Sequence, residues 1–284
     1  MTSPTPPSDA GTLPVCPRHP DRVAYVRCQR CGRPACPECQ RPAAVGVHCV
    51  DCVREAQAAG PARTTVFGGT VRSGRPLVTF VLIGLNLLVF LVEQAQGRSF
   101  IDRWIFAPSI GDSEPWRFLT AAFLHDPGSL LHIGFNMYAL WILGQFLEPV
   151  LGRWRFTAAY LLAALGGSVM VLLLASPDAL SWRTGVYGAS GAVFGLFGIV
   201  VIVLRRLRRD ARSILVILAI NAAIPIFVPD ISWQAHVGGF LVGLALGAVF
   251  AYAPRERRRV LGVAAVVGTA VLLVAVAAAS YAAV

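Results

Sequence analysis

Charged residues are scarce in this chain of 284 residues. Asp, Glu, Lys and Arg together make up 14% of it, whereas a soluble globular domain carries about a quarter. Hydrophobic residues make up 56%, and the mean hydropathy is +0.63. This composition excludes an ordinary soluble protein and indicates that lipid surrounds most of the chain.

Lysine is absent, so all 25 basic residues are arginine, which we attribute to genomic base composition. A net charge of +10 would suit nucleic acid, but the arginines lie between long apolar runs. Basic loops that face an anionic membrane leaflet explain this distribution better. We therefore expect a lipid bilayer, and no nucleic acid, as the partner of these charges.

Seven apolar runs predict seven transmembrane helices. A spanning helix needs roughly 17–25 apolar residues, and the first and fifth runs reach that length only with their flanking residues. The runs cover 77–92, 130–147, 156–175, 186–204, 214–228, 235–253 and 260–284. Arginines gather before the first run and in every second loop after it, and cytoplasmic loops are the arginine-rich ones. We expect a multi-pass protein of a bacterial plasma membrane, with a cytoplasmic N-terminus and an external C-terminus.

The connection over 93–129 is unusually long, and Phe100, Trp104, Phe106, Trp116 and Phe118 recur in it. Aromatic side chains favour the membrane interface, so this external loop is expected to lie partly in the outer leaflet. A folded loop that uses the aromatic residues as its own core is the alternative.

Four polar residues share one predicted depth in the membrane. The second, fourth and sixth runs cross in the same direction, and each has a polar residue within its first two turns. His132 and Asn136 begin the second run, Ser190 begins the fourth and His236 begins the sixth. Polar side chains inside a membrane are costly, so their coincidence indicates a functional site.

Serine and histidine at one depth suggest nucleophilic catalysis. Histidine is the usual base that removes the proton of a serine nucleophile. Glycines at four-residue or similar spacing follow Ser190 and His236 and would let their two helices approach closely. The free N–H groups at the start of the Ser190 helix, with His132 and Asn136, could bind an oxyanion.

Other membrane-protease chemistries lack their residues here. The sequence has no His-Glu-x-x-His motif for a metalloprotease and no aspartate inside a predicted span. No suitable acid lies near His236, so we expect a Ser–His dyad and not a triad. A transporter would place its polar residues along a path through the midplane, which this pattern does not do.

Several motifs together resemble the rhomboid family of intramembrane serine proteases over residues 76–252. They are Trp116-Arg117, Phe123-Leu124-His125, His132-x-x-x-Asn136, Gly144-x-x-x-Glu148-x-x-x-Gly152, Gly188-Ala189-Ser190-Gly191 and Ala235-His236-Val237-Gly238-Gly239-x-x-x-Gly243. The resemblance implies an all-α polytopic membrane protein, a six-helix bundle with a seventh helix at its C-terminus.

The same resemblance assigns roles. It implies Ser190 as nucleophile, His236 as general base, and His132, Asn136 and the Ser190 N–H as the oxyanion hole. Substrates would be transmembrane segments of other proteins, cut near the outer leaflet. The family often has tyrosine four residues after the serine, and Phe194 stands there instead. A catalytically silent rhomboid-like protein that binds membrane clients is the alternative function.

All seven cysteines lie between Cys16 and Cys52 and predict a small metal-binding module. With one histidine they form four pairs of two-residue spacing, Cys16-x-x-His19, Cys28-x-x-Cys31, Cys36-x-x-Cys39 and Cys49-x-x-Cys52. Such pairs typically bind zinc, and eight ligands imply two structural ions. Disulfides are the alternative, but they conflict with a reducing cytoplasm and an odd cysteine count.

The spacing of these pairs resembles a B-box zinc finger. That resemblance implies that the first and third pairs share one ion and that the second and fourth pairs share the other. His48 is then a spare residue or a substitute ligand. The module could bind a cytoplasmic partner, bind a substrate tail or only fold, and zinc would have no part in catalysis.

These predictions divide the chain into five segments. We expect a disordered tail over 1–15, the zinc module over 16–52, a polar linker over 53–75, the six-helix protease domain over 76–253 and the seventh helix over 254–284.

Overall fold

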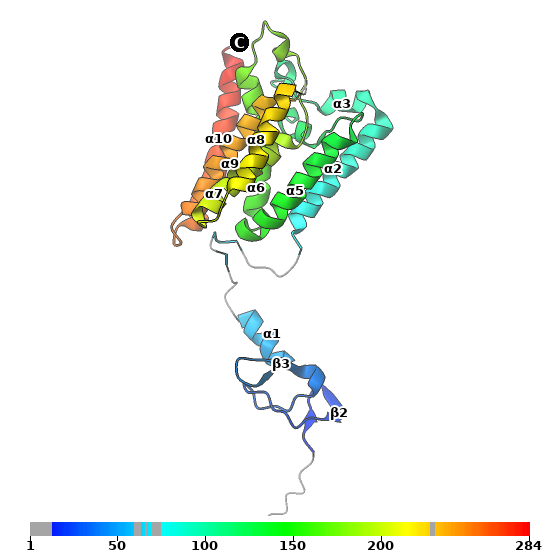
Figure 1. The fold of residues 1–284 in the computed structure, drawn as a ribbon, viewed down its shortest axis with the longest axis vertical. Coiled ribbons are helices and arrows are strands. Elements are labelled where there is room, and N and C mark those ends of the chain that lie inside the picture. Colours follow the sequence, from blue (N-terminus) through cyan, green and yellow to red (C-terminus); the bar gives the residue numbers. More distant parts are fainter. Residues whose placement is uncertain (1–12, 60–63, 66, 70–74, 228–230) are drawn as a thin grey trace, which may run out of the picture. The chain divides into compact units, whose positions relative to one another are not determined.

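The chain forms two compact units, Met1–Arg63 and Thr64–Val284. The computed structural model shown in Figure 1 describes residues 13–59, 64–65, 67–69, 75–227 and 231–284. Most of the predicted tail, up to residue 12, therefore lies outside the described residues, as do 60–63, 66, 70–74 and 228–230.

The first unit has little regular structure. Two antiparallel pairs of short strands, a short 3-10 helix and one α-helix make up its described part. These elements are β1 (Val15–Cys16), β2 (His19–Val23), the 3-10 helix Pro37–Cys39, β3 (Gln40–Pro42), β4 (Val47–Cys49) and α1 (Val50–Ala59). Its buried core consists of six cysteines and two alanines, with no large aliphatic or aromatic side chain. Apolar burial alone therefore offers this unit little stability.

The structure differs from the predicted linker over 53–75 at both ends. Helix α1 continues the first unit to Ala59, beyond the predicted boundary at residue 52. On the other side, Thr65 Oγ1 donates a 2.6 Å hydrogen bond to the Val150 carbonyl, and Phe67 is 2% exposed in the core of the second unit. A single phenylalanine in a polar stretch was too weak a pattern to predict this contact.

The second unit is a helical bundle, as predicted (Figure 1). Each predicted apolar run lies largely in one helix. These helices are α2 (Leu77–Gln96), α5 (Leu130–Leu151), α6 (Arg153–Leu174), α7 (Ser190–Arg206), α8 (Arg212–Phe227), α9 (Trp233–Tyr252) and α10 (Arg258–Ala282). Within the described residues, all but α7 and α8 are long and apolar enough to cross a membrane. The protein is therefore an integral membrane protein, and seven spans stay a prediction.

Helix α7 packs against both α6 and α9, which also pack against each other. Its residues from Gly191 to Val200 are all buried, which explains why α7 is apolar on every side. Helix α10 packs on α6 and α9. Helices α5, α7 and α9 all start at the same end of the bundle, which brings their first turns together.

Glycines allow the backbones of α7 and α9 to touch, as the sequence predicts. A Cβ atom added to Gly239 would overlap the Gly191 carbonyl oxygen, and one added to Gly243 would overlap the Gly195 carbonyl oxygen. One added to Gly198 would lie 2.7 Å from the Phe240 carbonyl oxygen. No side chain fits between these helices, so the seam requires glycine.

The Gly-x-x-x-Glu-x-x-x-Gly motif joins α5 to the start of α2. The Glu148 carboxylate accepts hydrogen bonds from the Val78 N–H at 3.0 Å and from the Thr79 N–H and hydroxyl, each at 2.8 Å. Gly144 leaves room for the Thr79 side chain, and Gly152 ends α5 with a φ of 82°. An acidic side chain thus caps the exposed amides of a helix N-terminus, where negative charge is favourable.

The long connection after α2 is folded. It contains α3 (Arg98–Trp104), α4 (Arg117–Thr120) and the 3-10 helices Pro108–Ile110 and Ala121–Phe123. Arg117 Nη1 donates to the Asp102 and Ile105 carbonyls at 2.7 and 2.9 Å. Phe106 and Phe118 are buried against each other, with ring centroids 4.3 Å apart. The aromatic residues of this connection therefore have two roles. Phe106 and Phe118 form a core, whereas Trp104 and Trp116 stay exposed.

Replacement of Gly243 by alanine tests the seam. We expect Gly243→Ala to destabilise the protein by about 1–3 kcal/mol, since the added methyl group must displace a backbone carbonyl. The control is Gly268→Ala in α10, where a Cβ meets nothing within 4 Å. That change should be neutral or stabilising, because alanine is the better helix former. Thermal unfolding in detergent measures both, and equal effects would contradict the role of the seam.

Candidate active site and metal sites

Ser190 is the first residue of α7. Gly188 precedes it with a φ of 127°, a conformation that other residues rarely adopt, and its N–H donates to the Ala121 carbonyl at 2.9 Å. The N-cap Ala189 offers no side-chain acceptor, so the first amides of α7 have no side-chain cap. Ser190 therefore lies at a helix N-terminus where N–H groups can bind an anion.

The structure brings His236 to Ser190. His236 lies in the first turn of α9 and is 8% exposed, and Ser232 caps this helix by accepting from the Ala235 N–H at 3.4 Å. The His236 Nε2 atom is 2.9 Å from Ser190 Oγ. This distance is within the range for direct proton transfer between a nucleophile and its base.

Stacking orients the His236 ring. Phe194 lies one turn after Ser190, and its ring stacks on the imidazole with centroids 4.0 Å apart and planes at 6°. The Nδ1 atom of His236 has no hydrogen-bond partner among the described residues. Among the described residues, no carboxylate therefore bonds to this nitrogen. The hydroxyl that Phe194 lacks is not needed for the stacking.

His132 points its protonated nitrogen toward the serine. Its Nδ1 accepts the Asp126 N–H at 3.2 Å, so the proton of the neutral ring lies on Nε2. A Cβ atom added to Gly188 would be 3.1 Å from His132 Nε2 and 3.7 Å from Ser190 Oγ. Glycine at 188 therefore keeps a space open between a donor and the serine hydroxyl.

Asn136 lies one turn after His132 and is 7% exposed. Its Nδ2 donates to the His132 carbonyl at 2.9 Å, within its own helix. Of the four polar residues predicted at one depth, Ser190 and His236 are directly bonded and His132 faces the same space. Asn136 is joined to them only through the backbone of His132.

Sequence reasoning gave no role to His125 and Glu93. The Glu93 carboxylate accepts the His125 N–H at 3.0 and 3.2 Å, and both residues are fully buried. The His125 ring lies 5.2 Å from the His132 ring. Burial, with the nearby His132, lowers the pKa of His125 to about 3, so it stays neutral beside His132. An acid in the last turn of an apolar helix was the signal available in the sequence.

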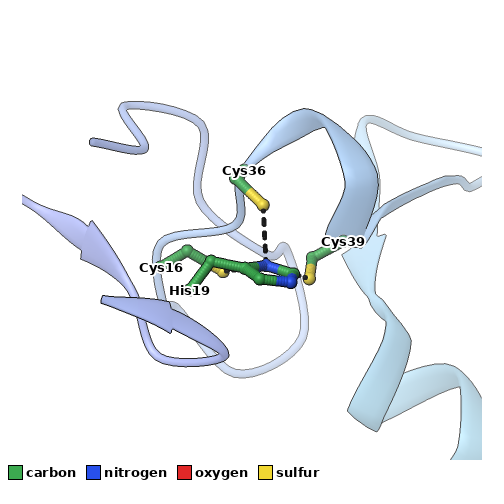
Figure 2. Close-up of side chains that lie close together, drawn as sticks. All are labelled: Cys16, His19, Cys36 and Cys39. Atoms are coloured by element: carbon green, nitrogen blue, oxygen red, sulfur yellow. Dashed lines mark hydrogen bonds between the residues drawn. The ribbon is translucent and has the colours of Figure 1, made fainter. Parts of the chain in front are cut away.

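The first unit contains two clusters of metal-binding side chains. One consists of Cys16, His19, Cys36 and Cys39, shown in Figure 2, and the other of Cys28, Cys31, Cys49 and Cys52. Within each cluster the ligand atoms all lie within 4.8 Å of one another. The first and third pairs of the sequence thus come together, as do the second and fourth, and this is the grouping that the B-box resemblance implies. His48 belongs to neither cluster.

The cluster geometry fits a tetrahedral metal ion. His19 Nδ1 lies 3.2 and 3.4 Å from the sulfur atoms of Cys36 and Cys39, and the sulfur atoms of Cys31 and Cys49 are 3.7 Å apart. Sulfur ligands about 2.3 Å from a tetrahedral zinc ion would be about 3.8 Å apart. These cysteines are free, not joined as disulfides. Hydrogen bonds from backbone amides, that of Cys36 first, lower the pKa of Cys16 to about 6, whereas burial raises the pKa of Cys39 in the same cluster to about 11.

Comparison with known proteins agrees with the fold. A sequence model of the rhomboid domain matches residues 112–253, which is half of the chain. The chain is 31% identical over 183 residues to rhomboid protease GluP of Bacillus subtilis, covering 62% of this chain and 35% of that protein. It is 33% identical over 149 residues to RHOMBOID-like protein 5 of Arabidopsis thaliana, covering 51% and 47%.

A third relative is matched over most of its length. Rhomboid protease GlpG of Haemophilus influenzae is 26% identical over 174 residues, which cover 61% of this chain and 90% of that protein. The first two relatives, in contrast, are spanned over less than half of their length. With the domain match over half of the chain and the motifs in their family order, this protein is a member of the rhomboid family.

Proposed function

We propose that this protein is an intramembrane serine endopeptidase that cleaves transmembrane segments of other proteins with a dyad of Ser190 and His236. The observation that supports this most is the 2.9 Å contact between Ser190 Oγ and His236 Nε2, inside a helical membrane domain. Relatives named as rhomboid proteases support the same reaction class.

In the proposed reaction His236 Nε2 takes the proton of Ser190 as Oγ attacks the carbonyl carbon of the scissile peptide bond. The tetrahedral intermediate collapses when the protonated imidazole gives this proton to the leaving amine, which leaves an acyl group on Ser190. Water, deprotonated by the same nitrogen, then hydrolyses the ester and restores the serine. Phe194 keeps the imidazole plane in place through these transfers.

The negative charge of the intermediate needs donors that are already in position. The Ser190 N–H at the start of α7 and the His132 Nε2–H are the two that face this space best. Asn136 can add its second Nδ2 proton, because only one is used on the His132 carbonyl. We assign these three groups to the oxyanion hole.

A catalytically silent client binder is the second candidate. One relative, RHOMBOID-like protein 5, has a name that does not call it a protease, which is compatible with such a binder. An intact and hydrogen-bonded Ser190–His236 pair argues for the enzyme, since a silent binder has no use for it. Labelling of the purified protein with a fluorophosphonate, which reacts with activated serines, separates the two.

Removal of either dyad residue should abolish both labelling and cleavage of a model transmembrane substrate. Because the two residues act as a unit, Ser190→Ala, His236→Ala and the double variant should be equally inactive. Ser280→Ala is the matched control, since that hydroxyl only bonds to the Val276 carbonyl in α10. Cleavage that persists in Ser190→Ala would reject the assignment.

The oxyanion assignment predicts a loss in turnover and not in affinity. His132→Ala should lower kcat by roughly 10²–10³, because its donor acts on the transition state. Asn136→Ala should cost less, since its side chain also bonds within its own helix. Steady-state kinetics in detergent separate kcat from KM, and an effect on KM alone would make these residues structural.

We further propose that each Cys/His cluster binds one structural zinc ion. Zinc would replace the missing apolar core of the first unit, because metal binding in such small folds supplies about 10–16 kcal/mol of folding energy. The cytoplasmic side is the place we propose for this unit and for any partner it binds. The ions would have no part in proteolysis, since neither cluster contains a residue of the proposed active site.

Metal analysis of the purified protein tests this. We expect two zinc ions per chain in the wild type and one in Cys36→Ser, which breaks only the first cluster. His48→Ala, a histidine outside both clusters, should retain two. Fluorophosphonate labelling of Ser190 should survive Cys36→Ser, and its loss would couple the metal unit to the active site.

A further inference from the structure

A pocket with two arginines in its lining lies at the end of the bundle opposite to Ser190. It has a volume of about 420 Å³ and is lined by Gly68, Trp154, Arg155, Arg259 and Val263. Helix α5 starts at the active-site end and runs 22 residues, roughly 33 Å, before α6 begins beside this pocket. The pocket is therefore separate from the proposed active site.

Arg155 is the central group of this pocket. It is 3% exposed, yet none of the ion pairs found among the described residues involves it. Its Nη1 donates to the Phe67 carbonyl at 2.9 Å, and its guanidinium lies 5.0 Å from the Trp154 ring centroid. Its buried Nε has no hydrogen-bond partner in the described part of the chain. A buried cation without an acid is costly and points to an anionic ligand.

Neighbouring charges and glycines fit such a ligand. Arg258 begins α10, and its buried Nε likewise lacks a partner among the described residues, while Arg259 is exposed at the pocket. A Cβ atom added to Gly68 would lie 3.2 Å from Arg155 Nη1, and one added to Gly262 would lie 3.3 Å from Arg155 Nε. Glycine at both positions therefore keeps a Cβ atom away from the guanidinium, which is buried and lines the pocket. Arginine in this setting suits a phosphate group.

An apolar stripe continues from the pocket along α10. Val263 lines the pocket and is 46% exposed. Val267, Val271 and Val274 follow at spacings that place them on the same face of the helix, and each is more than half exposed. In a membrane protein such a face lies against lipid. A ligand with a phosphate head at Arg155 and an acyl chain along the stripe would therefore match both the arginine pocket and the valine stripe.

We propose that this pocket binds the phosphate headgroup of an anionic phospholipid, held between α6 and α10, with the exposed Trp154 at the membrane interface. The lipid joins the start of α10 to α6 and to the segment around Phe67. Arg155 and Arg259 contact the phosphate, and the valine stripe contacts the acyl chain.

Native mass spectrometry of the full chain in detergent tests this with added phosphatidylglycerol. We expect a bound lipid, and we expect Arg259→Gln to weaken its apparent affinity about five-fold. Val263→Trp, which fills the pocket without a change in charge, should prevent binding. The matched controls are Arg255→Gln, an exposed arginine outside the pocket lining, and Leu272→Trp, on the opposite exposed face of α10. Both should bind as the wild type does.

Three outcomes would overturn the proposal. Equal losses of lipid affinity in Arg259→Gln and Arg255→Gln would mean that general surface charge attracts the lipid and that the pocket is not a specific site. Equal affinity for phosphatidylcholine would mean that the negative charge of the lipid is not recognised. Displacement of phosphatidylglycerol by an equal concentration of inorganic phosphate would mean that the pocket binds free phosphate and not a lipid.

Discussion

The direct contact of two helix backbones, α7 and α9, is the constraint on which the candidate active site depends. Ser190 and His236 come from different helices, and a serine side chain is too short to span an ordinary helix–helix distance. At two points a glycine of α9 lies against a backbone carbonyl of α7. Gly239 lies against the Gly191 carbonyl, and Gly243 lies against the Gly195 carbonyl. This close approach places Ser190 Oγ 2.9 Å from His236 Nε2. A larger residue at Gly239 or Gly243 would overlap a backbone carbonyl of α7.

The surrounding polar groups show how a membrane domain satisfies its own hydrogen bonds. Glu148 caps the first amides of α2, Glu93 accepts the His125 N–H, and Arg117 donates to loop carbonyls. Hydrocarbon offers no replacement for these partners, so each must come from the protein. Seven buried side-chain atoms of the described residues depart from this rule, and two of them are His236 Nδ1 and Arg155 Nε. One lies in the candidate dyad, and the other lies at the pocket that we assign to a lipid phosphate.

The first unit faces a different problem of stability. It buries cysteines and alanines in place of large apolar side chains, and its two Cys/His clusters, each of which could hold a metal ion, bring together side chains from distant parts of the unit. The sequence predicted these clusters because cysteine and histidine ligands of metal ions come in closely spaced pairs. The sequence did not predict the position of Phe67, since one aromatic residue among polar neighbours gives no periodic signal. The Phe67 side chain is nevertheless buried in the core of the second unit.

The sequence alone determined the membrane class, the approximate helix ranges, the metal-ligand pairs and the common depth of Ser190, His236 and His132. These follow from composition, hydrophobic length and spacing, which are local properties of the chain. Only the tertiary structure decided which donors face the serine: it turned His132 Nε2 toward Gly188 and tied Asn136 to its own helix. It also showed the folded loop around Arg117 and a buried Arg155 that forms no ion pair in the described part of the chain. Side-chain rotamers and contacts between distant segments depend on packing, which no local sequence pattern records.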